Sequence, residues 1–209
     1  MKKILMLLCL CCAAAGLSAE TSLPVETPAA QEEVLASKIK EIADRFRAVN
    51  TISARFTQEK KLAILNEPVI SRGLFYFSKK PSRIRWEYTE PFQNGFLLDA
   101  DNTYRLEKGV KKKVKGVLAR NIASQMLVWL AFDLHSLSNS YHINLLENGV
   151  ELTPKSDDNK ILEKITVWFS KTNSRALEKI QMDEPGGDNT VLIFENTKIN
   201  KPIAEELFS

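Results

Sequence analysis

Residues Gly73 to Tyr88 read GLFYFSKKPSRIRWEY, and this stretch decides the fold class of the chain. A long apolar and aromatic segment is followed by a Lys-Lys-Pro break and by a second segment that alternates strictly. Successive side chains of a strand point to opposite faces, so Ile84, Trp86 and Tyr88 are expected on one face. The other face then carries Arg83, Arg85 and Glu87. The pattern predicts two paired strands with one face rich in rings and branched aliphatic side chains.

More strand-like segments lie on both sides of this pair. A first strand is expected from Thr51, with Ile52 and Phe56 on one face and with Leu62 and Ile64 continuing that face. Turn formers separate the remaining segments, which are residues 69–78, 83–89, 95–99, 103–108, 110–115, 141–147, 150–154, 161–170, 176–183 and 189–197. We expect a mainly β fold with some α: one highly curved antiparallel meander of about 11 strands, an incomplete half-barrel.

Two segments are helical in pattern. Apolar residues recur at three- and four-residue steps between Gln31 and Val49, at Val34, Leu35, Ile39, Ile42, Phe46 and Val49. Residues 119–132 are apolar on most of their circumference and contain neither glycine nor proline. We expect two or three helices to cap the curved sheet as a lid.

The N-terminal residues resemble an export signal. Lys2 and Lys3 precede an apolar run that ends in small residues before Glu20, so residues 1–19 are predicted to be a cleaved signal peptide. Residues 20–30 are expected to be a flexible leader, and residues 31–209 a single domain. All three cysteines lie in the signal, and none follows a small residue as lipidation requires. The mature protein is therefore expected to be a soluble, unlipidated monomer in the periplasm.

Charge and motifs exclude several functions. The chain has 29 Lys+Arg and 26 Asp+Glu, which argues against nucleic-acid binding. The basic run Lys111, Lys112, Lys113 and Lys115 suits a solvated edge strand, with docking to an acidic partner or membrane surface as the alternative. With two histidines and no nucleophile, phosphate-loop or dinucleotide motif, we expect no catalytic residue, no metal and no cofactor, and so no enzyme.

Several strands carry large apolar groups on both faces, among them Phe75-Tyr76-Phe77 and Trp168-Phe169. Two interpretations remain open at this point. The apolar faces are filled by a helix-covered core, or a concave face lines a lipid cavity that the helices close.

Several stretches resemble the LolA family of periplasmic lipoprotein carriers. They are Ser53–Gln58 (SARFTQ), Gly73–Phe77 (GLFYF), Lys80–Tyr88 (KPSRIRWEY), Glu90-Pro91, Asp101-Asn102 and Leu152–Lys155. The resemblance implies a curved antiparallel half-barrel capped by helices, which shelters lipoprotein acyl chains. It implies two partners: an inner-membrane ABC transporter that releases the cargo and an outer-membrane acceptor. Where the family usually has an arginine before the proline, as a latch between barrel and lid, this chain has Lys80.

On this basis we predict a set of cavity-lining residues, with plain core packing as the alternative for each. They are Phe56, Phe75, Phe77, Ile84, Trp86, Tyr88, Phe96 and Leu98 from the sheet, and Ile122, Met126 and Trp129 from the second helix. Other functions remain open: a carrier of another amphiphile, such as a glycolipid or aryl-polyene-type lipid, or a sensor domain of the same fold. The outer-membrane acceptor of this fold is disfavoured, because it needs a lipidated cysteine.

Overall fold

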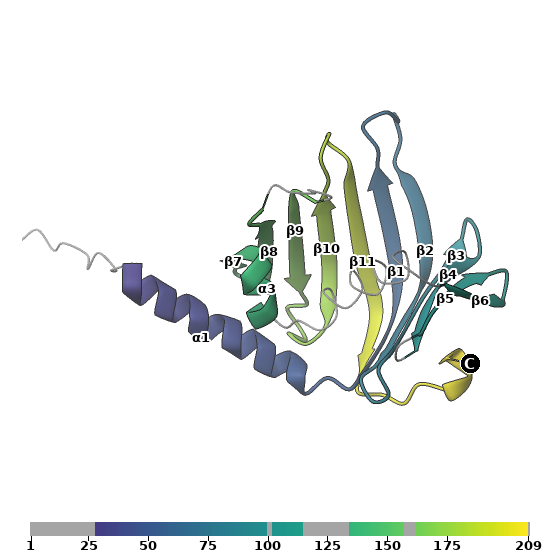
Figure 1. The fold of residues 1–209 in the computed structure, drawn as a ribbon, viewed down its shortest axis with the longest axis horizontal. Coiled ribbons are helices and arrows are strands. Elements are labelled where there is room, and N and C mark those ends of the chain that lie inside the picture. Colours follow the sequence, from purple (N-terminus) through teal and green to yellow (C-terminus); the bar gives the residue numbers. More distant parts are fainter. Residues whose placement is uncertain (1–27, 100–101, 115–133, 157–161, 209) are drawn as a thin grey trace, which may run out of the picture.

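The computed structural model describes residues 28–99, 102–114, 134–156 and 162–208 (Figure 1). One long helix, α1, spans Pro28–Arg47 and a short one, α3, spans Leu134–Ser140; a 3-10 turn, η1, spans Glu205–Phe208. The strands are β1 Thr51–Lys61, β2 Val69–Ser78, β3 Arg83–Glu90, β4 Asn94–Asp99, β5 Asn102–Glu107, β6 Val110–Val114, β7 Tyr141–Leu146, β8 Gly149–Pro154, β9 Lys164–Phe169, β10 Leu177–Asp183 and β11 Asn189–Ile199. Across the described residues no helix is both long and apolar enough to span a bilayer.

All eleven strands form one open antiparallel sheet in the order β6-β5-β4-β3-β2-β1-β11-β10-β9-β8-β7. The predicted fold class is therefore confirmed, but the expectation of one continuous meander is wrong. Two meanders, β1–β6 and β7–β11, are joined because the first strand pairs with the last, with Phe56 opposite Phe194. Strand β6, which contains Lys111–Lys113, is an edge of the sheet, as one reading of that basic run predicted.

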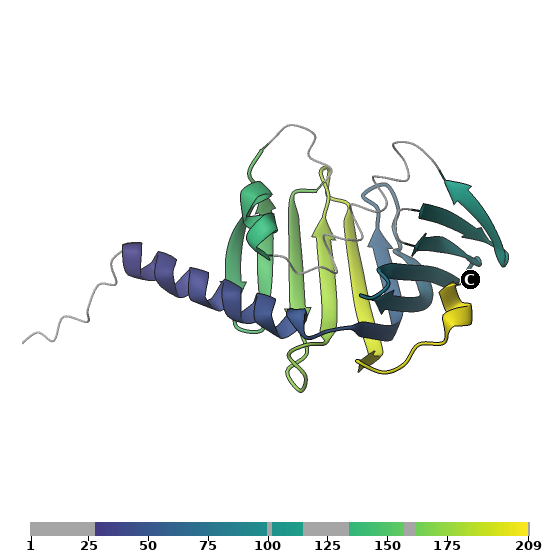
Figure 2. The ribbon, with the colours of Figure 1, turned by 60° about the horizontal axis from the view of Figure 1, so that its bottom comes forward.

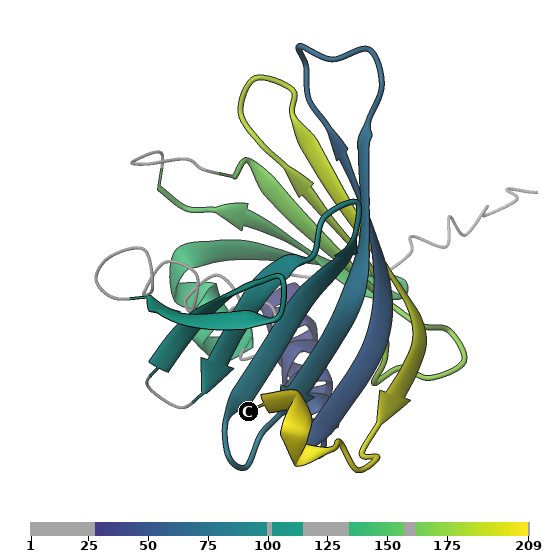
Figure 3. The ribbon, with the colours of Figure 1, turned by 90° about the vertical axis from the view of Figure 1, so that its right-hand side faces the viewer.

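The sheet is strongly curved, and its two faces differ in what covers them (Figure 3). Helices α1 and α3 lie on the same face: α3 packs beside β7, and α1 runs across that face as far as β9 and β10 (Figure 2). We call this the inner face, and the opposite one the outer face. Side chains of α1, α3 and nine strands form the main core there, including Phe46, Leu137 and Phe56. Phe46 of α1 contacts Phe169 of β9, with ring centroids 5.3 Å apart.

Helix α1 confirms most of the apolar stripe expected between Gln31 and Val49. Ile42, Phe46 and Val49 are buried in the main core, and Ile39 packs against it. Val34 is 52% exposed, because the N-terminal half of α1 extends beyond the β7 edge of the sheet (Figure 1). The helix begins at Pro28, so the last three residues of the predicted leader (residues 20–30) belong to it. Proline suits the first turn of a helix, where its missing N–H has no partner to lose.

The C-terminal turn η1 covers part of the outer face. Phe208 is buried there with Leu97 of β4 and Leu106 of β5. Two nitrogens of Arg83 donate to the Glu205 carboxylate at 2.7 and 3.0 Å, and its guanidinium lies 4.5 Å from the centre of the Phe208 ring. The predicted charged face of β3 therefore contacts the C-terminal turn η1 through Arg83.

The first strand ends earlier than its sequence suggested. Strand β1 stops at Lys61, and Ile64 lies in the β1–β2 turn with 90% of its surface exposed. The prediction that Leu62 and Ile64 continue the buried face is wrong, because both lie in the β1–β2 connection, where strand alternation no longer applies. The predicted helix over residues 119–132 lies outside the described residues.

Candidate functional site

The register of β1 to β4 brings the predicted sheet residues to the inner face. Phe75 of β2 lies opposite Trp86 of β3, and Trp86 lies opposite Phe96 of β4. In the row beside them, Phe77 lies opposite Ile84, which lies opposite Leu98. Because paired residues of neighbouring strands point to the same face, these rows form one continuous apolar surface. The alternation of residue types in β3 predicted the shared face of Ile84, Trp86 and Tyr88, while the pairing across β2 and β4 comes from the structure.

Trp86 is at the centre of a cluster of five rings on this surface, which we call the inner aromatic cluster. Its ring centroid lies 4.4 Å from that of Phe56, 5.6 Å from Phe75, 6.3 Å from Phe194 and 6.4 Å from Tyr88. These separations are in the range at which aromatic pairs attract beyond simple burial. The cluster links β1, β2 and β3 with β11.

Phe194 belongs to the cluster although the sequence did not suggest it as a site residue. The pattern Leu192-x-Phe194 marks a buried strand face, but pairing with β1 places it beside Trp86. That pairing joins residues far apart in the chain, and no local signal in the sequence indicates it.

Gly73 makes room for the ring of Phe56. The two residues are paired across β1 and β2. A β-carbon added to Gly73 would lie 2.5 Å from Cζ of Phe56 and would also collide with the backbone oxygen of Glu87. A glycine is therefore required here by close approach, because any side chain would displace Phe56 or the β3 backbone.

Tyr88 belongs to the cluster, and its only polar side-chain group, the hydroxyl, has a hydrogen-bond partner. Its hydroxyl donates to Oε1 of Gln58 at 2.8 Å, so the FTQ and RWEY stretches meet at this bond. Burial raises the pKa of the Tyr88 phenol above its ordinary value. The hydroxyl remains neutral, and the site presents rings and aliphatic groups rather than charge. Gln58 was not among the predicted site residues.

The predicted sheet residues differ in burial. Phe56, Phe75, Ile84 and Leu98 are buried in the main core, which fits the core-packing alternative for these four. Phe77, Trp86, Tyr88 and Phe96 pack against the core but are only partly buried. The latter four are the residues that still present apolar surface. Ile122, Met126 and Trp129 lie outside the described residues.

The β2–β3 turn contacts α1 through Lys79. Its Nζ donates to the backbone oxygen of Arg47, the last residue of α1, at 2.7 Å. Lys80, the predicted latch, is exposed in the same turn. A cation is favourable at a helix C-terminus, where the last carbonyls lack partners. Lys79 thus fastens the helix that covers the inner face, and the role of Lys80 stays a prediction.

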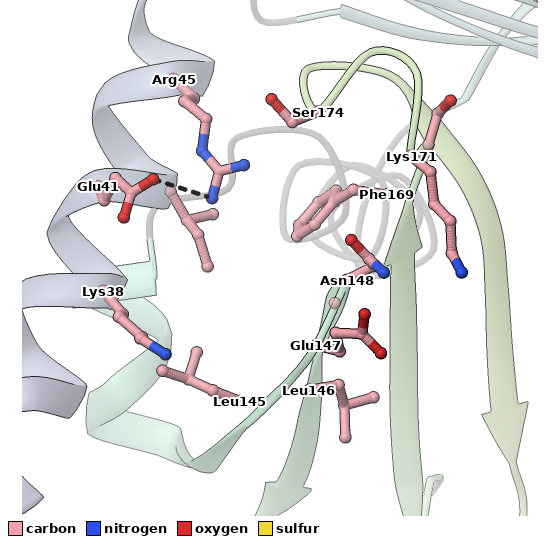
Figure 4. A pocket seen from close by; sticks show the side chains of 13 residues that line it. Lys38, Glu41, Arg45, Leu145, Leu146, Glu147, Asn148, Phe169, Lys171 and Ser174 are labelled. Carbon is pink, nitrogen blue, oxygen red and sulfur yellow. Dashed lines mark ion pairs between the residues drawn. The ribbon is translucent and has the colours of Figure 1, made fainter.

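A hollow of about 290 Å³ lies between α1 and the turns that follow β7 and β9 (Figure 4). Its apolar wall includes Ile42, Leu145 and Phe169, and charged side chains such as Lys38 and Arg45 border it. None of the predicted sheet residues lines it. The hollow is therefore separate from the inner aromatic cluster. In the described part of the chain, His, Asp and Glu side chains nowhere gather in a group of three that could hold a metal ion.

Comparison with known proteins agrees with the sequence resemblance. The model of the family described as "Outer membrane lipoprotein carrier protein LolA" matches residues 47–209. An outer-membrane lipoprotein carrier protein of Cupriavidus taiwanensis is 27% identical over 150 residues, which are 66% of this chain and 65% of the relative's length. One of Pseudoalteromonas translucida is 21% identical over 168 residues, covering 80% of this chain and 79% of the relative.

Two solved structures share the fold. The Pseudomonas aeruginosa MucA/MucB complex matches with a TM-score of 0.52 at 15% identity, over 83% of this chain and 60% of the other. Mycobacterium tuberculosis lipoprotein LppX matches with a TM-score of 0.51 at 13% identity, over 83% of this chain and 98% of the other. At these identities the likeness extends to the architecture only.

Proposed function

Since the chain belongs to the LolA family of outer membrane lipoprotein carrier proteins, we propose that it shelters lipoprotein acyl chains on the inner face of its sheet. The cargo is taken from an inner-membrane ABC transporter and passed to an outer-membrane acceptor, and the carrier works in the periplasm as a monomer. It carries out no chemical reaction. Binding and release of an apolar chain are its whole activity.

One observation carries this proposal: the rings of Phe77, Trp86, Tyr88 and Phe96 remain partly exposed although they pack against the core. Phenylalanine is among the residues most often fully buried in a packed core, yet Phe77 and Phe96 keep part of their surface exposed. Trp86 of β3 lies opposite Phe96 of β4, Tyr88 follows two residues along β3 on the same face, and Phe77 of β2 lies opposite Ile84 in the next row. A contiguous apolar strip of this kind suits an extended hydrocarbon chain.

The energetics suit a carrier. Each acyl methylene removed from water contributes about 0.8 kcal/mol, so several methylenes on the strip give useful affinity. Apolar contacts have no fixed direction, so chains of different length are tolerated. The hydrogen bond from Tyr88 to Gln58 leaves no unpaired hydroxyl against the chain. Release then needs only a competing apolar surface at the acceptor.

The test compares two tryptophans on opposite faces of the sheet. Trp86→Glu places a carboxylate in the inner aromatic cluster, while Trp168→Glu places the same group on the outer face, where Lys179 lies 4.2 Å from the Trp168 ring centre. Binding of a fluorescent fatty acid is measured for both variants, with circular dichroism to check folding. We expect Trp86→Glu to weaken binding at least about tenfold, since it removes a contact surface and adds a charge.

Trp168→Glu should bind the probe as the wild type does. Equal binding by the wild type and a folded Trp86→Glu variant would remove the inner aromatic cluster from the site.

Mass spectrometry of lipid copurified with the protein identifies the cargo. Acylated peptides would support lipoprotein transport, whereas a glycolipid or aryl-polyene-type lipid would assign the same site to another amphiphile.

A further inference from the structure

Exposed apolar side chains gather at one end of the sheet. Of the eight large hydrophobic residues that are exposed within the described part of the chain, six lie in or beside the β1–β2, β3–β4 and β5–β6 turns. In an antiparallel meander these alternate turns share one end of the sheet, and Lys108 N–H donates to the Gln93 oxygen between two of them at 3.3 Å. We call the six the apolar end: Ile64, Leu65, Val69, Ile70, Phe92 and Val110.

The β1–β2 hairpin projects beyond the other turns at this end (Figure 3). Its tip is held in place: the Ala63 N–H donates to the Asp188 carboxylate at 2.8 Å, and the Leu65 N–H donates to the Leu62 oxygen at 2.9 Å. Ile64 is nevertheless 90% exposed. A single exposed aliphatic side chain is ordinary, but Ile64 is accompanied by Leu65, Val69 and Ile70 on the same hairpin, and exposed apolar groupings of this kind mark interaction surfaces.

The β5–β6 hairpin at the apolar end is positively charged, because residues 105–113 contain five cations and one carboxylate. Beside the β1–β2 hairpin the charges are paired: Lys60 lies 3.3 Å from Glu184, and Arg72 lies 2.8 Å from Glu90. The positive excess at this end therefore comes from the β5–β6 hairpin, with Lys111, Lys112 and Lys113 on β6. Lysines beside exposed aliphatic side chains match a bilayer with anionic headgroups, where the apolar groups enter the acyl boundary and the ammonium groups meet the phosphates.

We propose that the apolar end docks this protein onto an anionic lipid bilayer, with the β1–β2 tip inserted and the lysines of β6 on the headgroups. A bilayer receives a convex tip without a matching groove, which is why a membrane fits this surface better than a protein partner. Docking in this way places the protein at the membrane independently of any transporter or acceptor. It requires no cargo, and so it stands apart from the acyl-binding proposal.

The experiment uses the protein without residues 1–19, the mature form expected from the predicted signal peptide. Cosedimentation is measured with vesicles of phosphatidylcholine and with vesicles that also contain phosphatidylglycerol. Ile64→Asn is compared with Ile193→Asn, a matched change at an aliphatic residue that is 41% exposed on the outer face, away from the apolar end. We expect Ile64→Asn to partition about tenfold more weakly, comparable with the transfer of one aliphatic side chain, and Ile193→Asn to behave as the wild type.

Binding of the wild type should require phosphatidylglycerol and should weaken as salt is added. The double variant Lys111→Gln with Lys113→Gln should bind the phosphatidylglycerol vesicles more weakly, and its binding should depend less on salt. Its fatty-acid binding should be unchanged. Absence of wild-type binding to the anionic vesicles overturns the proposal, and so does equal binding by Ile64→Asn. If Ile64→Asn impairs cargo delivery in a system where no vesicle binding is seen, the tip is assigned to a protein groove instead.

Discussion

Gly73→Ala is the most direct test of how the inner aromatic cluster is built. The new β-carbon would lie 2.5 Å from Cζ of Phe56 and would overlap the backbone oxygen of Glu87. Overpacking of this kind costs about 1–3 kcal/mol. Replacing glycine by alanine returns about 0.4–1 kcal/mol by restricting the unfolded chain. The net loss is about 1–2 kcal/mol, which lowers the Tm of a domain of this size by about 2–8 °C.

The assay is thermal unfolding followed by circular dichroism, together with tryptophan fluorescence. Trp86 lies 4.4 Å from Phe56, so displacement of the Phe56 ring should change the emission of the folded state. Gly186→Ala is the control. Gly186 has φ 85° and no atom within 4 Å of an added β-carbon, so its cost of about 1 kcal/mol comes from backbone conformation alone. It should lower the Tm without altering the emission.

A double variant separates the two collisions. Phe56→Leu removes the ring atoms that Gly73→Ala would meet, so the two changes together should cost less than the sum of their separate costs. The residual cost reports the overlap with the Glu87 oxygen. An unchanged Tm for Gly73→Ala, or strictly additive costs in the double variant, would refute the argument that Gly73 is required by close approach.

Two further predictions concern the C-terminal turn and the covering helix. The hydrogen bond from Arg83 lowers the pKa of Glu205 below its ordinary value. The bond therefore stabilises the fold at pH values above the ordinary pKa of a glutamate. This stabilisation is lost as the pH falls through the lowered pKa of Glu205. Urea unfolding of the wild type and of Glu205→Gln should therefore differ at pH 7 and converge in acid; a difference that persists in acid would contradict this. Lys79→Met removes the bond to the Arg47 oxygen and should destabilise the last turn of α1 by about 1 kcal/mol, seen as faster amide exchange there. Lys80→Met is the matched control. Equal amide exchange in the last turn of α1 in both variants would show that Lys79 does not stabilise this turn.

Much of the sheet could be predicted from the sequence because strand alternation is local. The strict pattern of Ile84, Trp86 and Tyr88 is enough to place these three side chains on one face, whatever the neighbouring strands are. The turns after Ser78 and Glu90 are marked by prolines, and the structure has them there. The same local rule failed at Ile64, where alternation continued in the sequence after the strand itself had ended.

The site was predicted only in part, for a related reason. A strand pattern gives the face of a residue but not its partners, so Phe194 and Gln58 were missed although they contact Trp86 and Tyr88. Burial could not be predicted either: Phe75 and Trp86 face each other, yet only Phe75 is fully buried. How deeply each ring is covered depends on helices and strands from distant parts of the chain.

By itself, then, the sequence determined the strands, their inward faces and the family resemblance, because each depends on residues a few positions apart. The tertiary structure decided that the first strand pairs with the last, that Phe208 is buried against part of the outer face, and that six exposed hydrophobic side chains lie in or beside turns at one end of the sheet. These features bring together segments separated by many residues. The free energy that selects them comes from burial and hydrogen bonding in the assembled fold, which no local pattern encodes.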